Sequence, residues 1–208
     1  MHDIMALNNR TNSPRIFLGI AYGKITHRVQ GQETPETYTD VEGHLKDIII
    51  RNAEIKGVPT PFMDLIIEDG ADTYNLSVQL NSGVARSIIL SLASVQNFIG
   101  NTVRINPYLS KDGEHTNIAV YVNNQKVSWV VEPSQIPALE YVQVGSQKVA
   151  DDTKRSKFIN QHVLLLQKRL KDAQATPQAQ AQESYDMGES GEDLPPEEDV
   201  FAEGSQHL

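Results

Sequence analysis

The strongest constraint on the fold is a strict alternation of apolar and polar residues over positions 73–80. Successive strand residues point to opposite faces of a sheet, so this segment predicts a half-buried strand with Tyr74, Leu76 and Val78 on its inner face. Asp69-Gly70 precedes it and follows another extended run, 62–68. An Asp-Gly step between two such runs favours a tight hairpin, because both turn residues adopt positive φ. The two runs are therefore expected to pair.

The apolar period changes directly after this hairpin. Apolar side chains recur at spacings of three and four from Val84 through Ile88 and Leu92, which is the period of a helix. Ser82 stands where an N-cap is needed, and Gly100 stands where the chain can leave the helix. We therefore expect a helix between the third and fourth strands of a central block.

Five strands accompany this helix in the block 45–150. They are expected at 45–55, 62–68, 73–80, 102–109 and 117–123, with turns at 111–113 and 123–124 and a further extended run at 126–131. Three strands, a helix and two strands is the order of the five-stranded OB barrel. The expected fold is mainly β: an N-terminal extension with short strands at 1–44, an OB-like barrel and connector at 45–150, and a C-terminal helix at 151–174.

The formal net charge of −9 lies entirely in the last part of the chain. Residues 175–208 hold nine of the 27 acidic residues and no Lys or Arg, which leaves 18 acidic against 18 basic residues in 1–174. A segment of this composition cannot bury enough apolar surface to offset the entropy lost on ordering. We expect a disordered acidic tail that competes with nucleic acid for a basic groove or offers a linear epitope to partners.

Several function classes are disfavoured by what the sequence lacks. There is no cysteine, so a thiolate nucleophile, a disulfide or a cysteine-based zinc site is excluded. The six histidines are scattered without the paired spacing of a metal site, and the glycines at 19 and 23 are too close for a phosphate-binding loop. We expect no enzyme activity, cofactor or metal. No stretch approaches the ~20 apolar residues of a membrane helix, so we expect a cytoplasmic protein that does not contact membranes.

An OB-like block followed by a low-complexity linker and an acidic tail resembles the single-stranded DNA-binding proteins of bacteria and their phages. The segment 194–201, Leu-Pro-Pro-Glu-Glu-Asp-Val-Phe, resembles the acidic-hydrophobic tip through which that family contacts replication and repair proteins. Seven residues follow the phenylalanine, so the free carboxylate beside the aromatic ring in that family is missing. The resemblance implies coating of exposed DNA in replication, recombination or repair, in a bacterial cell or a phage-infected host. It also implies partner contacts at Glu197, Glu198, Asp199, Val200 and Phe201.

Binding of single strands requires cations along the phosphates and exposed rings that stack on bases. The alternation in 102–109 and 117–123 puts Arg104, Tyr108 and Tyr121 opposite the core. Lys111 and His115 fall in the connecting loop, and Trp129 is a weaker stacking candidate. The expected interface is Arg51, Arg86, Arg104, Tyr108, Lys111, Tyr121 and Lys126.

The neutral charge of residues 1–174 keeps a second function open. The chain is also compatible with a protein-interaction or adaptor module that uses the barrel and the last helix and binds no nucleic acid. The run Leu164-Leu165-Leu166 is compatible with self-association into a homo-oligomer. RNA binding is a third alternative.

Overall fold

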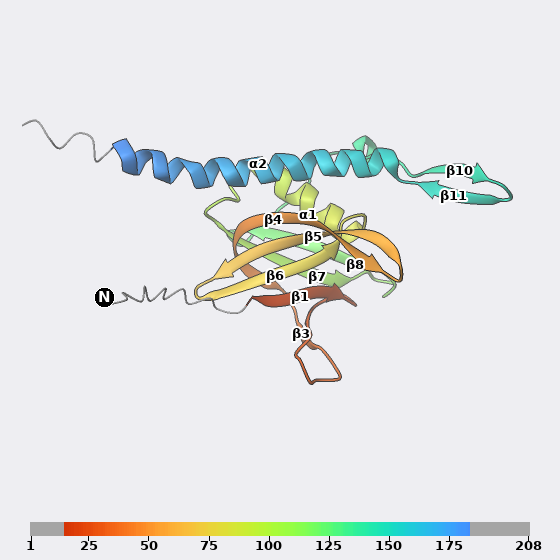
Figure 1. The fold of residues 1–208 in the computed structure, drawn as a ribbon, viewed down its shortest axis with the longest axis horizontal. Helices are drawn as coiled ribbons and strands as arrows, with labels where there is room; N and C mark the ends of the chain where they lie inside the picture. Colours follow the sequence, from red (N-terminus) through yellow and green to blue (C-terminus); the bar gives the residue numbers. More distant parts are fainter. Residues whose placement is uncertain (1–14, 184–208) are drawn as a thin grey trace, which may run out of the picture. The chain divides into compact units, whose positions relative to one another are not determined.

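A computed structural model describes residues 15–183 (Figure 1). The expected tail contacts, Glu197, Glu198, Asp199, Val200 and Phe201, lie outside the described residues. Residues up to Ala173 belong to one compact unit, and those from Gln174 belong to a second.

One large mixed sheet dominates the first unit. Its strand order is β3-β2-β1-β6-β5-β4-β7-β8-β9, and β1 pairs with β6 in parallel while the other neighbours are antiparallel. A mainly β fold is therefore confirmed, but hydrogen bonds do not close the sheet, which ends at β3 and β9. The strands are β1 (Ile16–Ala21), β2 (Lys24–His27), β3 (Glu36–Tyr38), β4 (Val41–Ile55), β5 (Val58–Asp69), β6 (Asp72–Gln79), β7 (Thr102–Leu109), β8 (Thr116–Val122) and β9 (Gln125–Lys126).

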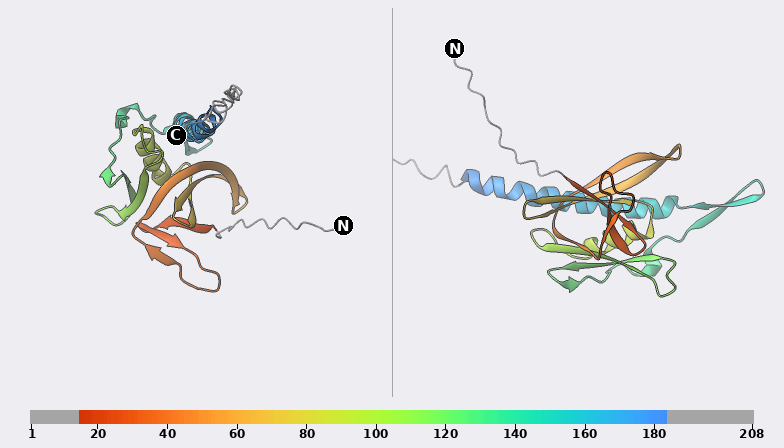
Figure 2. Two further views of the ribbon diagram at one scale, coloured as in Figure 1. Left: turned by 90° about the vertical axis from the view of Figure 1, so that its left-hand side faces the viewer. Right: turned by 90° about the horizontal axis from the view of Figure 1, so that it is seen from below.

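Strand β4 links the two halves of the sheet. Its residues 41–44 pair with β7, and its residues 44–55 pair with β5, with a register shift between Leu45 and Asp47. Figure 2 shows the orange strand bending through a wide arc. A bulge bends and twists a strand, so β4 changes direction between its two partners. Strand β5 starts at Val58, earlier than the expected residue 62. Its first residues, which include Pro59 and Pro61, pair with β4 alone, and a strand with one neighbour tolerates proline.

The N-terminal strands are part of this same sheet. The Tyr22-Gly23 turn joins β1 to β2, with positive φ at both residues. Strand β3 pairs with β2 and forms one edge of the sheet. The turn lies against the start of β8, because the Gly23 N–H donates to Thr116 Oγ1 at 3.1 Å. Residues 16–38 therefore support the central strands rather than extending from them.

Two helices complete the fold, α1 (Gly83–Ala93) and α2 (Thr153–Glu183). Ser82 is the N-cap of α1, as expected, and its hydroxyl accepts from the Ala85 N–H at 3.1 Å. One face of α2 joins the core of the sheet, and the Gln167 side-chain amide donates to the Ile48 carbonyl at 2.7 Å. The helix continues beyond residue 174, where it was expected to end, so residues 175–183 of the expected tail are helical. The core residues of α2 are Ile159, Val163, Leu166 and Leu170.

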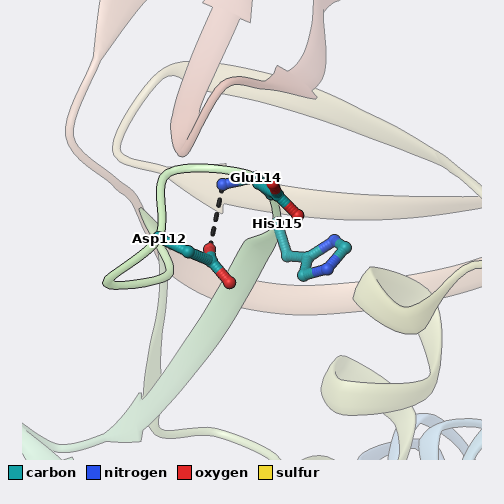
Figure 3. Close-up of side chains that lie close together, drawn as sticks. All are labelled: Asp112, Glu114 and His115. Carbon is teal, nitrogen blue, oxygen red and sulfur yellow. Dashed lines mark hydrogen bonds between the residues drawn. The ribbon is translucent and has the colours of Figure 1, made fainter.

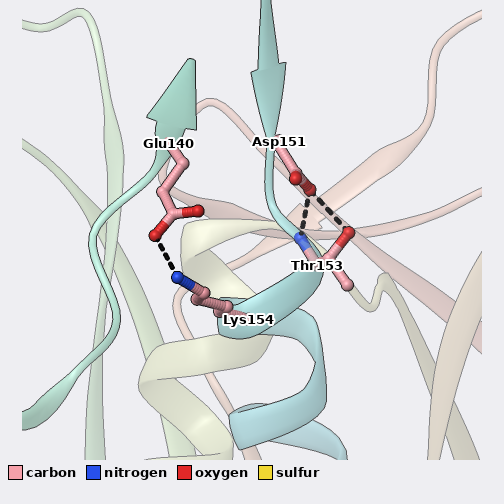
Figure 4. Close-up of polar contacts among 4 residues, drawn as sticks. All are labelled: Glu140, Asp151, Thr153 and Lys154. Atoms are coloured by element: carbon pink, nitrogen blue, oxygen red, sulfur yellow. Dashed lines mark hydrogen bonds and ion pairs between the residues drawn. The ribbon is translucent and has the colours of Figure 1, made fainter. Parts of the chain in front are cut away.

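The segment between β9 and α2 differs from the expected connector. The extended run 126–131 is wrong beyond Lys126, where pairing ends. A 3-10 turn (Pro133–Gln135) follows, and then a separate hairpin of β10 (Glu140–Val144) and β11 (Gln147–Asp151) leads into α2. Glu140 pairs with Lys154, and Asp151 accepts from Thr153, so polar contacts tie the hairpin to the helix (Figure 4). No helix within residues 15–183 has the length and apolar character needed to cross a membrane.

Candidate nucleic-acid interface

Strands β7 and β8 bury one face and leave the other partly exposed. Val103 and Ile105 of β7 and Val120 of β8 belong to the core. Arg104 pairs with Tyr121, and Tyr121 pairs with Lys126 on β9, so these three residues form a row across three strands on the opposite face. Tyr108 lies four residues along β7 from Arg104 and shares that face. We call the surface formed by Arg104, Tyr108, Tyr121 and Lys126 the aromatic face.

Arg104 and Tyr121 are in direct contact. The guanidinium carbon lies 4.4 Å from the centroid of the ring, which is a cation–π geometry. The Arg104 Nε lies 3.9 Å from a carboxylate oxygen of Glu42, the residue that pairs with Arg104 on β4. One side of the Tyr121 ring therefore faces the Arg104 guanidinium, whose side chain is 30% exposed.

Tyr108 and Trp129 border a shallow hollow on the same side of β8. The hollow measures about 380 Å³ and is also lined by Lys126, Ser87 and Ser91. The Trp129 indole N–H donates to Ser91 Oγ at 3.1 Å, which fixes the ring against α1. Trp129 is 36% exposed and Tyr108 is 44% exposed. Trp129, expected to be the weaker candidate, is therefore available for stacking beside Tyr108.

The loop between β7 and β8 carries Lys111, which is exposed. Asp112 shapes this loop, since one of its carboxylate oxygens accepts from the Ser110 hydroxyl and from the Glu114 N–H. The Ser110 hydrogen bond is the main cause that holds the pKa of the Asp112 carboxyl below its ordinary value. Asp112, Glu114 and His115 bring ligand-type atoms within 4.8 Å of one another, all exposed (Figure 3). Hydrogen bonds within the loop account for the position of the Asp112 carboxylate.

Tyr22 is a further aromatic residue at this end of the sheet and is absent from the interface expected from the sequence. It is 85% exposed at the tip of the β1–β2 hairpin. The neighbouring Gly23 lies so close to the backbone of Tyr108 and Leu109 that a Cβ there would come within 2.6 Å of the Leu109 nitrogen. The sequence signal for Tyr22 was an aromatic residue beside glycine in a tight turn. The proximity of this turn to β7 could not be predicted, because the two segments are far apart in the sequence.

Carboxylates gather near the Glu42 end of the row. A hollow of about 380 Å³, lined by residues of β1 through β6, includes the acids Glu36, Asp40, Glu42 and Asp69. His27 is the one basic residue among its described lining residues. The charge around the aromatic face is therefore uneven, with acids beside β4 and Lys126 beside β9.

Arg51 and Arg86 do not lie on the aromatic face. The Arg51 Nε donates to Asp64 Oδ2 at 2.6 Å, a terminal nitrogen donates to Ser77 Oγ at 3.0 Å, and the guanidinium lies over Phe62. Asp64 is only 4% exposed, so Arg51 neutralises a buried carboxylate. Arg86 lines a different hollow, next to Arg155 of α2. The structure thus brings together Arg104, Tyr108, Tyr121 and Lys126, with Lys111 in the adjoining loop.

Comparisons of the chain with protein-family models, curated proteins and solved structures found no match.

Proposed function

We propose that this chain is a single-stranded DNA-binding protein that coats exposed strands in replication, recombination or repair. The observation that carries the proposal is the aromatic face, where a row of guanidinium, phenol and ammonium groups lies beside two further exposed rings. Rings stack on any base, at about 1–3 kcal/mol per base, and cations follow the phosphates. This combination suits binding without sequence preference.

The strand connections support an OB-like origin for the central block. The order β4-β5-β6-α1-β7-β8 has a helix after the third strand, as the OB barrel does. The first of these strands pairs with both the second and the fourth. We propose that the β1–β2 hairpin closes the remaining gap, because β1 pairs with β6 while its turn contacts the start of β8.

The uneven charge favours one path for the strand. The acidic hollow near Glu42 repels phosphates, whereas Lys126 and Lys111 attract them. A strand that stacks on Tyr121, Tyr108 and Trp129 would keep its backbone on the lysine side.

A protein-interaction module is the second candidate, and two surfaces favour it. Tyr141 on the β10–β11 hairpin and Leu164 on α2 are each 65% exposed. Glu42 also offsets part of the charge of Arg104. This alternative predicts no binding to either single or double strands.

Titration with a ~30-nucleotide oligothymidine, a duplex of equal length and the matching RNA oligomer tests the proposal, because several OB-fold footprints fit on that length. We expect binding to the single strand that exceeds binding to the duplex and weakens as salt rises, with a log–log slope of about −0.7 per phosphate neutralised. Preference for the RNA would reassign the substrate. If the chain binds none of the three oligomers, the protein-interaction module is the remaining candidate function.

A further inference from the structure

A small hollow lies between the starts of α1 and α2. It measures about 110 Å³, far below the ~300 Å³ at which sites for drug-sized ligands begin. Arg86 of α1 and Arg155 of α2 both line it, together with the hydroxyl-bearing Ser82 and Ser156. Its size suits a small ion rather than a nucleotide.

Neither guanidinium group is paired with a carboxylate of the described residues. The Arg155 Nε donates to the Pro137 carbonyl at 2.9 Å. Within residues 15–183, neither Arg86 nor Arg155 has a carboxylate at ion-pair distance. Burial, and next the charge of Arg155, lowers the pKa of Arg86. Two half-buried like charges therefore line one hollow without an ion-pair partner in the described part of the chain.

One carboxylate also lines the hollow. Asp152 brings a single negative charge against the two guanidinium groups, so the described lining keeps a net positive charge. A planar guanidinium offers paired N–H donors that match the oxygens of a phosphate. The chemistry that would balance the hollow is thus a compact oxyanion.

We propose that a phosphate group binds in this hollow between Arg86 and Arg155. The group is either a phosphodiester of a bound strand or free inorganic phosphate. Arg86 adjoins Ser87 on α1, and Ser87 lines the Tyr108–Trp129 hollow, so a strand on the aromatic face has a route across α1. The phosphodiester source rests on the proposed function, whereas the free-phosphate source does not.

The first arm adds inorganic phosphate to the full chain and follows the arginine Nε–H signals by NMR. We expect saturable shifts at Arg86 and Arg155 that are lost in R86Q and retained in R28Q. Arg28 is exposed, lies outside the hollow and provides the same change of charge. R86K, which keeps the charge without the paired donors, should bind more weakly than the parent and guards against a folding defect in R86Q.

The second arm measures oligothymidine binding against salt. A phosphodiester source predicts that R86Q lowers the log–log slope by about 0.7 relative to R28Q. Phosphate-induced shifts with an unchanged slope identify free phosphate as the ligand. Unshifted arginine signals together with an unchanged slope overturn the proposal while leaving the single-strand function intact. If the parent chain binds no oligomer, the proposed function fails and the first arm alone decides this site.

Discussion

The central guanidinium carbon of Arg104 lies over the Tyr121 ring, 4.4 Å from its centroid. The two residues are paired across β7 and β8, so the contact is fixed by strand register rather than by loop conformation. A base that stacks here meets the pair as one surface.

This coupling leads to a double-mutant prediction. We expect R104A and Y121A each to weaken oligothymidine binding by about 1–3 kcal/mol, the range for loss of one stacking contact. The double variant should lose less binding free energy than the sum of the losses in the two single variants, because each single change already disrupts the shared surface. Fluorescence titration measures all four affinities. Y141A removes a more exposed ring, 65% accessible, from the β10–β11 hairpin and serves as the control; if the three variants bind like Y141A, the aromatic face is not the interface.

Arg51 should affect stability rather than binding. Its removal leaves the Asp64 carboxylate, 4% exposed, without its charged donor. Hydrogen bonds to charged groups contribute about 1.5–3 kcal/mol, and half of the Arg51 side chain is exposed, so we expect R51A to lower the free energy of unfolding by about 1–2 kcal/mol. Urea denaturation gives this value. Oligothymidine affinity should stay at the parental level, and a loss of binding with unchanged stability would return Arg51 to the interface.

Gly23 should be intolerant of a side chain for two separable reasons. Its φ is +68°, and an added Cβ would lie 2.6 Å from the Leu109 nitrogen. We expect G23A to destabilise the fold by more than the roughly 1–3 kcal/mol of backbone strain alone. Gly57 has φ +79° but open space around it, so G57A measures strain without a clash. Equal losses of unfolding free energy in G23A and G57A would show that the hairpin does not press on β7.

Local patterns were enough to predict much of this fold. Alternation identified β6, β7 and β8, turn residues identified the hairpins at Gly70 and Asn123, and Ser82 marked the start of α1. Each of these depends on neighbours within a few residues. The parallel pairing of β1 with β6 joins segments far apart in the chain, so no local signal reports it.

The candidate site was predicted in part for the same reason. Strand alternation is enough to put Arg104, Tyr108 and Tyr121 on one face. Strand alternation does not reveal that Arg51 forms an ion pair with Asp64, because that contact joins β4 to β5. The exposure of Trp129 was missed because the segment after Lys126 follows the serines of α1 instead of forming a strand.

The junction of β11 and α2 should respond to acid and to base. Hydrogen bonds from Thr153 hold the pKa of the Asp151 carboxyl below its ordinary value, and Glu140 raises the pKa of Lys154 (Figure 4). The stabilisation of the fold by the Asp151 carboxylate is present above the pKa of an unfolded aspartate, about 3.9. It is lost as pH falls through the lower pKa of Asp151 in the folded chain. The stabilisation of the fold by the Lys154 ammonium is present below the pKa of an unfolded lysine, about 10.4. It is lost as pH rises through the higher pKa of Lys154 in the folded chain.

These groups are exposed, so the effect is local. We expect the Thr153 amide signal in NMR to shift in acid with a midpoint below that of an ordinary aspartate, and D151N to abolish the transition. A Thr153 titration that survives in D151N would assign the shift to another carboxylate.

Removal of residues 184–208 should tighten oligothymidine binding. That segment carries eight acidic residues and no Lys or Arg, so it competes with phosphates for the same cations. Because exposed charges are screened, the gain should be largest at low salt and shrink as ionic strength rises. A full-length variant with the eight acids replaced by their amides separates charge from length and should match the truncation. If both variants bind as the parent does at low salt, the tail does not compete, and its acidic residues act on partners alone.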